Sequence, residues 1–306
     1  MLLRRASLTV AILAALAGGL VATNALAQRA APGDVTASTA LVGVVQFDTG
    51  LDDGGDFRWY DLQASGSLTR QFTTDFAAGL TLRYDYQNWS FDAPKAFGGN
   101  APWSNVRAAT VGLNLTWLPT PEWRIGFNPT FEWSGESGAE TGESLDYGAV
   151  VSATRIFSPD LVLGLGAGVF RQLEDTKVFP FVVVNWKITD RLRLTNPLPA
   201  GPAGGAGLEL AYALSDGWEF GAGGSYRSYR FRLDKDGPVP GGIGENRFFP
   251  VFARLSYGFG PATHLNFYAA AFVNGELNVM RADGSDLASD DYDVAPAIGV
   301  SFTHRF

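Results

Sequence analysis

The sequence predicts an all-β fold, a membrane-spanning, antiparallel up-and-down β-barrel of about 14 strands. Three observations predict it. Apolar residues recur at every second position, the runs that do so are about twice the usual strand length, and the connections between runs alternate between short and long. A tilted strand of about ten residues crosses a bilayer, so these runs have the length that a membrane barrel requires.

The period-two alternation is clearest in 75–86 and 161–169. In the first run the even positions are apolar or aromatic and the odd positions are mostly polar or small, and in the second run glycines fill alternate positions. One face of such a strand is apolar and the other is polar or small. The same reading along the chain predicts strands near 35–48, 56–69, 75–88, 105–118, 122–133, 144–157, 160–171, 177–188, 190–195, 206–214, 217–232, 247–259, 263–275 and 292–306.

The connections between these strands alternate in length, as they do in barrels with tight turns at one end and longer loops at the other. The short connections are 70–74, 119–122, 158–160, 189–190, 215–217 and 260–262, and the long ones include 89–104, 134–143, 235–246 and 276–291. The ninth and tenth strands are short and flank the proline-rich segment 197–202. Without that pair the barrel would have 12 strands, and the count is even in both cases.

Aromatic residues gather at the predicted strand ends. Amphipathic rings are favoured at membrane interfaces, so the pattern predicts one aromatic belt at each end of the barrel. The belt beside the short turns would contain Phe72, Phe76, Trp117, Trp123, Phe157, Trp218 and Phe259, and the belt toward the long loops Tyr84, Tyr86, Trp133, Tyr147, Tyr226 and Tyr292.

The last predicted strand alternates from Val294 and ends on an aromatic residue, with Phe302 and Phe306 on its apolar face. This strand resembles the C-terminal signal of Gram-negative outer-membrane proteins. The resemblance implies that Phe302 and Phe306 are read by the barrel-assembly machinery during biogenesis. It also implies the bacterial outer membrane as the location, with the lipid bilayer and lipopolysaccharide as partners.

A narrower resemblance rests on the C-terminal third. The segments 231–234, 238–245 (PVPGGIGE) and 248–259, with 275–277 and 282–284, resemble a family of Gram-negative outer-membrane β-barrels known only as a domain of unknown function. The resemblance implies a barrel and supplies no catalytic residue and no substrate.

The N-terminal segment has the pattern of a secretory signal peptide. Arg4 and Arg5 precede an apolar stretch of about 15 residues, which is shorter than the roughly 20 that a transmembrane helix needs. Ala25-Leu26-Ala27 is a small-residue cleavage site. We therefore expect residues 1–27 to be a cleaved signal peptide, and residues 28–306 to be a single outer-membrane β-barrel domain exported through the periplasm.

The composition argues against an enzyme. The chain has no cysteine and two histidines, His264 and His304, both predicted beside the short-turn end of the barrel. Aspartates crowd 283–293 without the spacing of an EF-hand, which favours a solvated acidic loop over a metal site. We expect no catalytic residue, no metal and no cofactor. The net charge of −8 argues against nucleic acid as a partner.

Glycines 164, 166 and 168 do not form a nucleotide-binding motif, because the spacing is wrong and no helix pattern follows. In a barrel they would share the inward face. A hairpin around residues 172–176 would place Gly166 opposite Val183 and Gly168 opposite Phe181. Small residues facing large ones would let the wall pack or bend.

The inward phase of the strands is where function is expected. Charged side chains facing lipid at mid-depth are costly, so those in the strands should face the lumen or lie at the rims. The candidate pore-lining residues are Arg83, Asp85, Arg124, Glu132, Lys187, Glu209, Glu219, Arg227 and Arg254.

A polar inward face and about 14 strands predict a passive channel for small solutes, whose identity the sequence leaves open. Acidic outer loops predict a mild preference for cations, to which Asp85, Glu132 and Glu209 would contribute. One alternative is a carrier for apolar small molecules. Carriers of that kind with 14 strands have an N-terminal hatch, whereas only 28–34 would precede the first strand here. The other alternative is a structural or surface-interaction barrel without transport.

Overall fold

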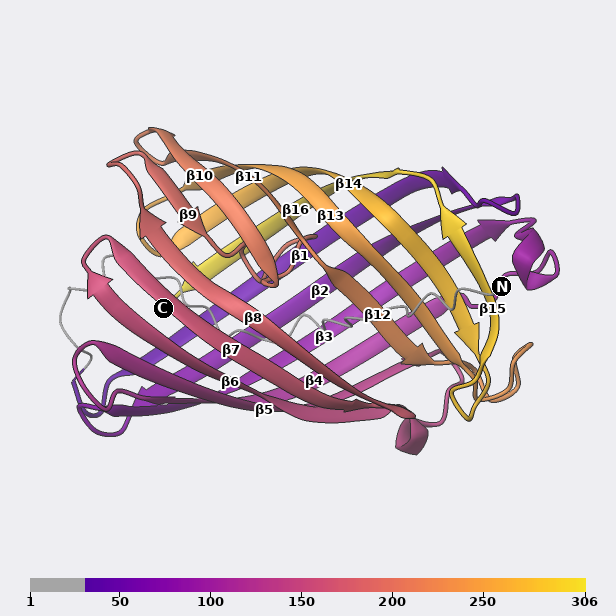
Figure 1. Ribbon diagram of the computed structural model, residues 1–306, viewed down its shortest axis with the longest axis horizontal. Helices are drawn as coiled ribbons and strands as arrows, with labels where there is room; N and C mark the ends of the chain where they lie inside the picture. The colour runs from indigo at the N-terminus through magenta and orange to yellow at the C-terminus, as the bar shows by residue number, and fades with distance from the viewer. Residues whose placement is uncertain (1–30) are drawn as a thin grey trace, which may run out of the picture.

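The computed structural model describes residues 31–306 as one antiparallel sheet rolled into a barrel (Figure 1). The predicted signal peptide lies outside the described residues. The strands are β1 (Val35–Gly50), β2 (Asp56–Gln71), β3 (Phe76–Asp92), β4 (Asn105–Trp117), β5 (Trp123–Glu136), β6 (Leu145–Ser158), β7 (Leu161–Gln172), β8 (Asp175–Lys187), β9 (Leu192–Thr195), β10 (Gly207–Ser215), β11 (Trp218–Ser225), β12 (Arg227–Arg232), β13 (Ile243–Gly258), β14 (Thr263–Met280), β15 (Asp286–Tyr292) and β16 (Ala295–Arg305). Two short 3-10 turns, η1 (Lys95–Phe97) and η2 (Thr141–Glu143), lie in connections.

The sheet closes because β1 pairs with both β2 and β16. Two strands of the barrel are each interrupted once. β11 and β12 pair with successive parts of β13, and β16 and β15 pair with successive parts of β14. When each interrupted strand is counted once, the barrel is closed and has 14 strands. The predicted fold is therefore confirmed with 14 strands, and the alternative count of 12 is wrong.

Each interruption has a local cause in the partner strand. Pro250 of β13 lies where the ladder between β13 and the β11/β12 strand is broken, and proline has no N–H to donate. Asn274 of β14 has a positive φ of 51° and lies opposite the gap between β15 and β16. Asn274 lies at a β-bulge, because the β13–β14 register shifts by one residue between Arg247 and Phe249.

The outer face of the barrel is apolar, and the aromatic belt at the turn end is confirmed, since all seven of its predicted members are exposed. At the loop end, Tyr84 and Tyr147 are exposed as predicted. The prediction is wrong for two residues of that belt. Tyr226 and Tyr292 are buried, because the strands that hold them bend at the two interruptions and Tyr292 joins the packing inside the barrel.

The acidic segment 276–291 was predicted as a long loop and is mostly a hairpin. β14 continues to Met280 and β15 begins at Asp286, so only the tip between them is a loop. The backbone N–H of Asp53, in the β1–β2 connection, donates to Asp290 Oδ1 at 3.2 Å. Acidic residues of the β1–β2 connection and of β15 therefore form part of one rim.

The glycines of β7 face large side chains, as expected, but in a different register. Gly166 lies opposite Phe181 and Gly168 opposite Phe179. The turn occupies Leu173 and Glu174, which centres the hairpin one residue earlier than predicted and shifts every partner by two. A Cβ on Gly168 would lie 2.2 Å from the Phe179 ring, so the ring occupies the space that glycine leaves.

In the described part of the chain, no helix is long and apolar enough to span a membrane.

Candidate functional site

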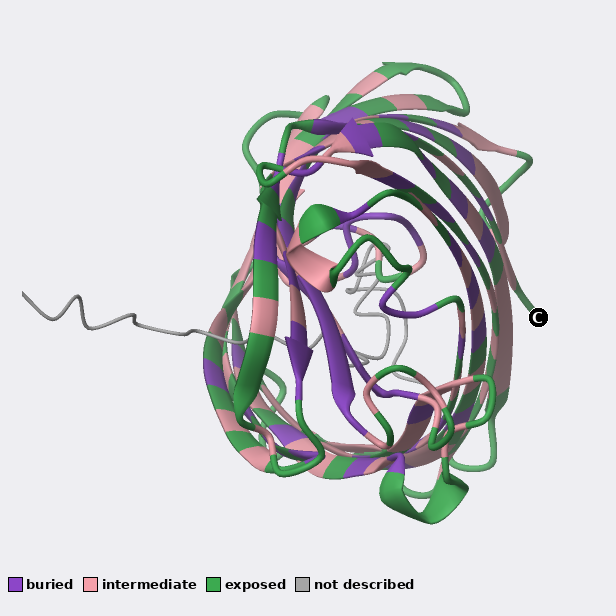
Figure 2. Ribbon diagram, turned by 90° about the vertical axis from the view of Figure 1, so that its right-hand side faces the viewer, coloured by how far each residue is buried: buried purple, intermediate pink, exposed green. Residues whose placement is uncertain are grey.

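The candidate site is the lumen of the barrel. Figure 2 looks down the barrel from the loop end and shows chain segments inside the ring of strands. Of the predicted pore-lining residues, seven fall into two groups: Arg254, Glu209 and Glu219 toward the turn end, and Arg83, Asp85, Glu132 and Arg227 nearer mid-depth. Arg124 and Lys187 lie near the turn end outside both groups.

The group toward the turn end is a buried ion-pair network. Arg254 on β13 pairs with Glu209 on β10 and, at 2.7 Å, with Glu219 on β11. Arg193 on β9 pairs with the other oxygen of Glu219 at 3.0 Å. Arg254 is 3% exposed and Glu209 is 1% exposed, so neither charge is hydrated at the surface. The network joins four neighbouring strands where their polar faces meet, and it fills this part of the wall.

The mid-depth group is built on β3 and β5. Arg83 pairs with Asp85 at 2.7 Å and with Glu132 at 3.5 Å. Glu132 also accepts a hydrogen bond from Thr110 on β4 at 2.9 Å. The alternation along β3 directs both charged residues to the lumen, and the register of β3, β4 and β5 brings their partners beside them. One guanidinium faces two carboxylates here, so Arg83 balances only part of the acidic charge.

Lys187 lies at the rim rather than in the lumen. Its ammonium pairs with Asp190 at 2.7 Å in the turn that follows β8. The hydrogen bond and charge of Lys187 hold the pKa of Asp190 below its ordinary value. His304 lies at the same end, where its Nδ1 and Thr263 Oγ1 are 2.7 Å apart. Within residues 31–306, no group of three or more histidine or acidic side chains could hold a metal ion.

β12 curls into the lumen, which the sequence did not predict. It pairs with β13 on one side, and its last residue, Arg232, meets Gly135 of β5 in a parallel bridge. The Arg232 guanidinium donates to the backbone oxygens of Glu143 and Gly241 at 2.9 Å and pairs with Glu174 at 3.0 Å. One buried arginine thus ties three connections together across the loop end.

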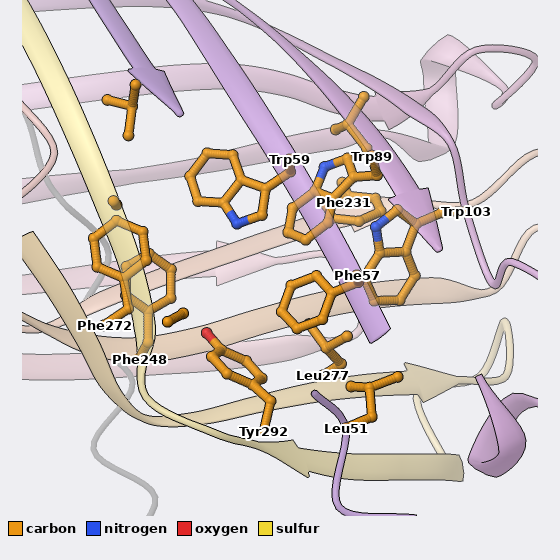
Figure 3. Packing of buried hydrophobic residues seen from close by; sticks show 14 of the residues in the cluster. Leu51, Phe57, Trp59, Trp89, Trp103, Phe231, Phe248, Phe272, Leu277 and Tyr292 are labelled. Carbon is orange, nitrogen blue, oxygen red and sulfur yellow. The ribbon is translucent and has the colours of Figure 1, made fainter. Parts of the chain in front are cut away.

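An aromatic cluster fills the lumen beside β12 at the loop end (Figure 3). Trp59 stacks on Trp89 with ring centroids 5.1 Å apart, and Trp103 meets Phe231 of β12 edge-on at 5.3 Å. Strands β2, β3, β12, β13, β14 and β15 all contribute to it. The main members of this cluster are Phe57, Trp59, Trp89, Trp103, Phe231, Phe248, Phe272 and Tyr292.

The connection between β9 and β10 also enters the lumen. The hydroxyl of Ser225 donates to the backbone oxygen of Ala203 at 2.7 Å, and the hydroxyl of Tyr268 donates to that of Ala200 at 3.4 Å. Ala203 is 1% exposed. The glycines and prolines of 197–206 give this segment no apolar strand face, so it leaves the wall and narrows the path. We call residues 197–206 the inner loop.

Where the inner loop leaves the wall, one edge of β8 is left open. β9 pairs with β8 only over Asn185–Lys187, and the Asn196 side chain bonds Val182 O and Val184 N beyond that. Among the described residues, the rest of that β8 edge has no strand partner. By alternation, the backbone nitrogen of Pro180 faces this open edge. Because proline has no N–H to donate, the edge is a poor site for pairing with another strand.

A polar cavity of about 30 Å³ remains between β12 and the opposite wall. We call it the β12 pocket. It is lined by Arg83, Asp85, Gln87, Val106, Ala108, Glu132, Ser134, Gln172, Arg227, Ser228, Tyr229, Arg230 and Phe231. Four of the predicted residues meet here, whereas Tyr229 and Arg230 were missed, because 217–232 reads as an ordinary wall strand. The run of glycine and proline at 197–206 was the only sign in the sequence that a nearby segment leaves the wall and enters the lumen.

The outer surface decides where the barrel resides. Leu41, Leu62, Leu165 and Val178 are all more than half exposed, and Leu165 reaches 70%. A belt of exposed aromatic rings borders this surface at the turn end. An apolar outer band with aromatic girdles around a closed sheet is favourable only in lipid. The protein is an outer-membrane β-barrel.

Comparison with known proteins agrees with this class. Residues 104–228, from the start of β4 to the start of β12, match the family described as a MetA-pathway of phenol degradation. The resemblance predicted from 231–284 lies outside the matched residues, while the broader prediction of an outer-membrane barrel is confirmed. No curated protein matches the sequence significantly.

Three solved structures are similar in fold at low identity. An outer-membrane channel from Pseudomonas putida F1 has 8% identity and a TM-score of 0.48, covering 90% of this chain and 97% of its own. The toluene transporter TodX from Pseudomonas putida has 10% identity, a TM-score of 0.45 and coverages of 90% and 91%. The toluene transporter TbuX from Ralstonia pickettii has 10% identity, a TM-score of 0.40 and coverages of 90% and 90%. None of the three reaches a TM-score of 0.5.

Proposed function

We propose that the protein is a passive channel for small solutes across the outer membrane. The observation that carries the proposal is the polar and charged inward face, which continues from the network at Arg254 to the one at Arg83. A barrel with only a structural role could fill its interior with apolar side chains. The inner loop and β12 narrow this path, so the solutes are small.

We further propose that the cation preference arises at the acidic rim rather than at the inner acids. Glu209 is paired with Arg254, and Asp85 and Glu132 share the single charge of Arg83, so the fields of these inner acids are partly cancelled. The rim acids include Asp53, Asp283 and Asp290. Hydrogen bonds from Ser285 hold the pKa of Asp283 below its ordinary value, so this carboxyl stays ionised above that lowered pKa. An acidic mouth concentrates cations before they enter.

Single-channel conductance of the refolded protein, with the reversal potential across a KCl gradient, tests both statements. We expect discrete steps and a mild cation preference. The double variant Asp283→Asn/Asp286→Asn should reduce that preference, whereas Glu209→Gln, the inner control, should change it less. If correctly folded protein shows no conductance steps, the channel proposal is refuted. If Glu209→Gln reduces the cation preference as much as the rim double variant does, the proposal that the preference arises at the rim is refuted.

A second candidate is a carrier for apolar small molecules, favoured by the aromatic cluster and the open edge of β8. The phenol-degradation description of the matched family agrees with an aromatic solute. Saturable binding of a fluorescent long-chain probe, with a blue-shifted spectrum, would support this function. Binding unchanged in Phe231→Ala would count against it.

We also propose that Phe302 and Phe306 serve as the assembly signal. Both are exposed, Phe306 beyond the end of β16. The rim acids provide a surface on which divalent cations could bridge to lipopolysaccharide. Deleting Phe306 should slow assembly in cells while leaving refolding in detergent unchanged.

A further inference from the structure

We infer that Asp290 and the β1–β2 connection form a binding site for a hydrated divalent cation, Ca²⁺ or Mg²⁺, at the loop-end rim. The bound ion ties the connection 51–55 to the hairpin of β14 and β15. The inference goes beyond the proposed channel, because the ion binds whether or not the barrel conducts. The sequence favoured a solvated acidic loop here, since nothing in it showed that one of these aspartates is buried.

Asp290 carries the inference. It is 4% exposed, although it belongs to an acidic rim. Its Oδ1 accepts the backbone N–H of Asp53 at 3.2 Å, so the carboxylate is directed at the β1–β2 connection. Its Oδ2 is buried and has no hydrogen-bond partner in the described part of the chain. A buried carboxylate oxygen without a donor or a cation is costly, and a bound cation relieves that cost.

The carboxylates around Asp290 add to the negative charge. Asp52 and Asp53 in the connection and Asp291 in β15 are all exposed. Burial is the main cause that raises the pKa of Asp290, and the charges of these three neighbours raise it further. The hydrogen bond from Asp53 offsets only part of this rise. A divalent cation is the ligand that four neighbouring carboxylates favour.

The basic groups of this rim do not balance the four acids. Lys95 lies over the connection, since a Cβ on Gly54 would come 2.9 Å from its Nζ, and it brings one positive charge. Arg58 and Arg247 are already paired with other acids. Arg281 lies at the hairpin tip, where it donates to the backbone. Even with Lys95 counted in full, three negative charges remain.

The main chain holds the connection against β15. The N–H of Asp52 donates to the backbone oxygen of Asp291 at 3.0 Å, and Leu51 forms an antiparallel bridge with Tyr292. Within residues 31–306, no three acidic side chains converge closely enough to enclose a bare ion, so the bound ion keeps part of its water shell. Mg²⁺ binds in this way through one or two carboxylates, and Ca²⁺ combines carboxylates with backbone oxygens and waters.

The test is a calorimetric titration of the refolded full chain, freed of metal with EDTA, in detergent micelles. The ligands are calcium chloride and magnesium chloride, and sodium chloride at equal ionic strength is the comparison salt. We expect one saturable site for the divalent ions with a Kd of about 0.1–1 mM, the range of extracellular calcium modules, and no saturation by sodium. Asp290→Asn keeps the shape of the side chain, removes its charge and should weaken binding by about tenfold or more.

Asp283→Asn is the matched control, because Asp283 is an exposed acid of the same hairpin that already accepts a hydrogen bond from Ser285 Oγ at 2.6 Å. Hydrogen exchange of the 51–55 amides is the second readout. The ion should slow it in the natural chain and in the control, and not in Asp290→Asn. If Asp290→Asn lacks heat-modifiable gel mobility, Asp53→Asn provides the comparison. Folded protein without saturable binding would overturn the inference. An equal loss in Asp290→Asn and the control would do so too, because it would show loose screening of the whole rim.

Discussion

Removing Arg254 should destabilise the barrel more than any other single change to its charged interior. Arg254→Gln leaves Glu209 buried at 1% exposure without its cation, while Glu219 keeps Arg193. Breaking one side of a buried ion pair typically costs roughly 3–5 kcal/mol. The low exposure of both groups limits screening by solvent, so we expect a loss within that range.

The double variant Arg254→Gln/Glu209→Gln distinguishes two causes of the lost stability, the loss of the ion-pair attraction and the burial of an unpaired carboxylate. Neutralising both partners removes the buried unpaired carboxylate, so most of the lost stability should return. The assay is equilibrium urea unfolding from lipid vesicles, followed by tryptophan fluorescence and heat-modifiable gel mobility. A single variant that loses less than about 1 kcal/mol, or a double variant no more stable than the single one, would refute the reasoning.

Four further predictions concern the wall, the inner loop and the rim. Leu165→Arg places a charge on the lipid-facing side and should cost roughly 2–4 kcal/mol, with reduced folded yield on gels and little effect from Leu165→Ala. Gly168→Val should lower stability in urea by about 1–3 kcal/mol, because its side chain would meet the Phe179 ring, and Gly142→Val, at an open site, serves as control. Shortening the inner loop by deleting 200–204 should raise single-channel conductance, and unchanged conductance would show that the loop does not narrow the path. Lowering the pH should leave the contribution of Asp283 to cation preference intact until below about 3.9, the ordinary aspartate value, as measured by reversal potential.

The wall of the barrel could be predicted from local pattern alone. Period-two alternation specifies which residues face lipid, because a shift of one residue would expose every polar side chain to the bilayer. Leu165 and Leu82 point outward as their phase requires, and Arg83 and Glu209 point inward. The strand count followed from the same periodicity and from the turn signals, even for the four-residue strand β9.

The interior was decided by tertiary structure. Whether 227–232 stays flat in the wall or curls toward β5 depends on contacts with Glu143, Glu174 and Trp103, all distant in sequence. The same holds for the partner of each inward charge, since the pairing of Arg254 with Glu209 requires the register of three strands. The sequence by itself determined a closed barrel with a polar inside, because lipid demands a fixed outer face. Only the fold decided how that inside is filled, because lumen contacts join residues that no local periodicity relates.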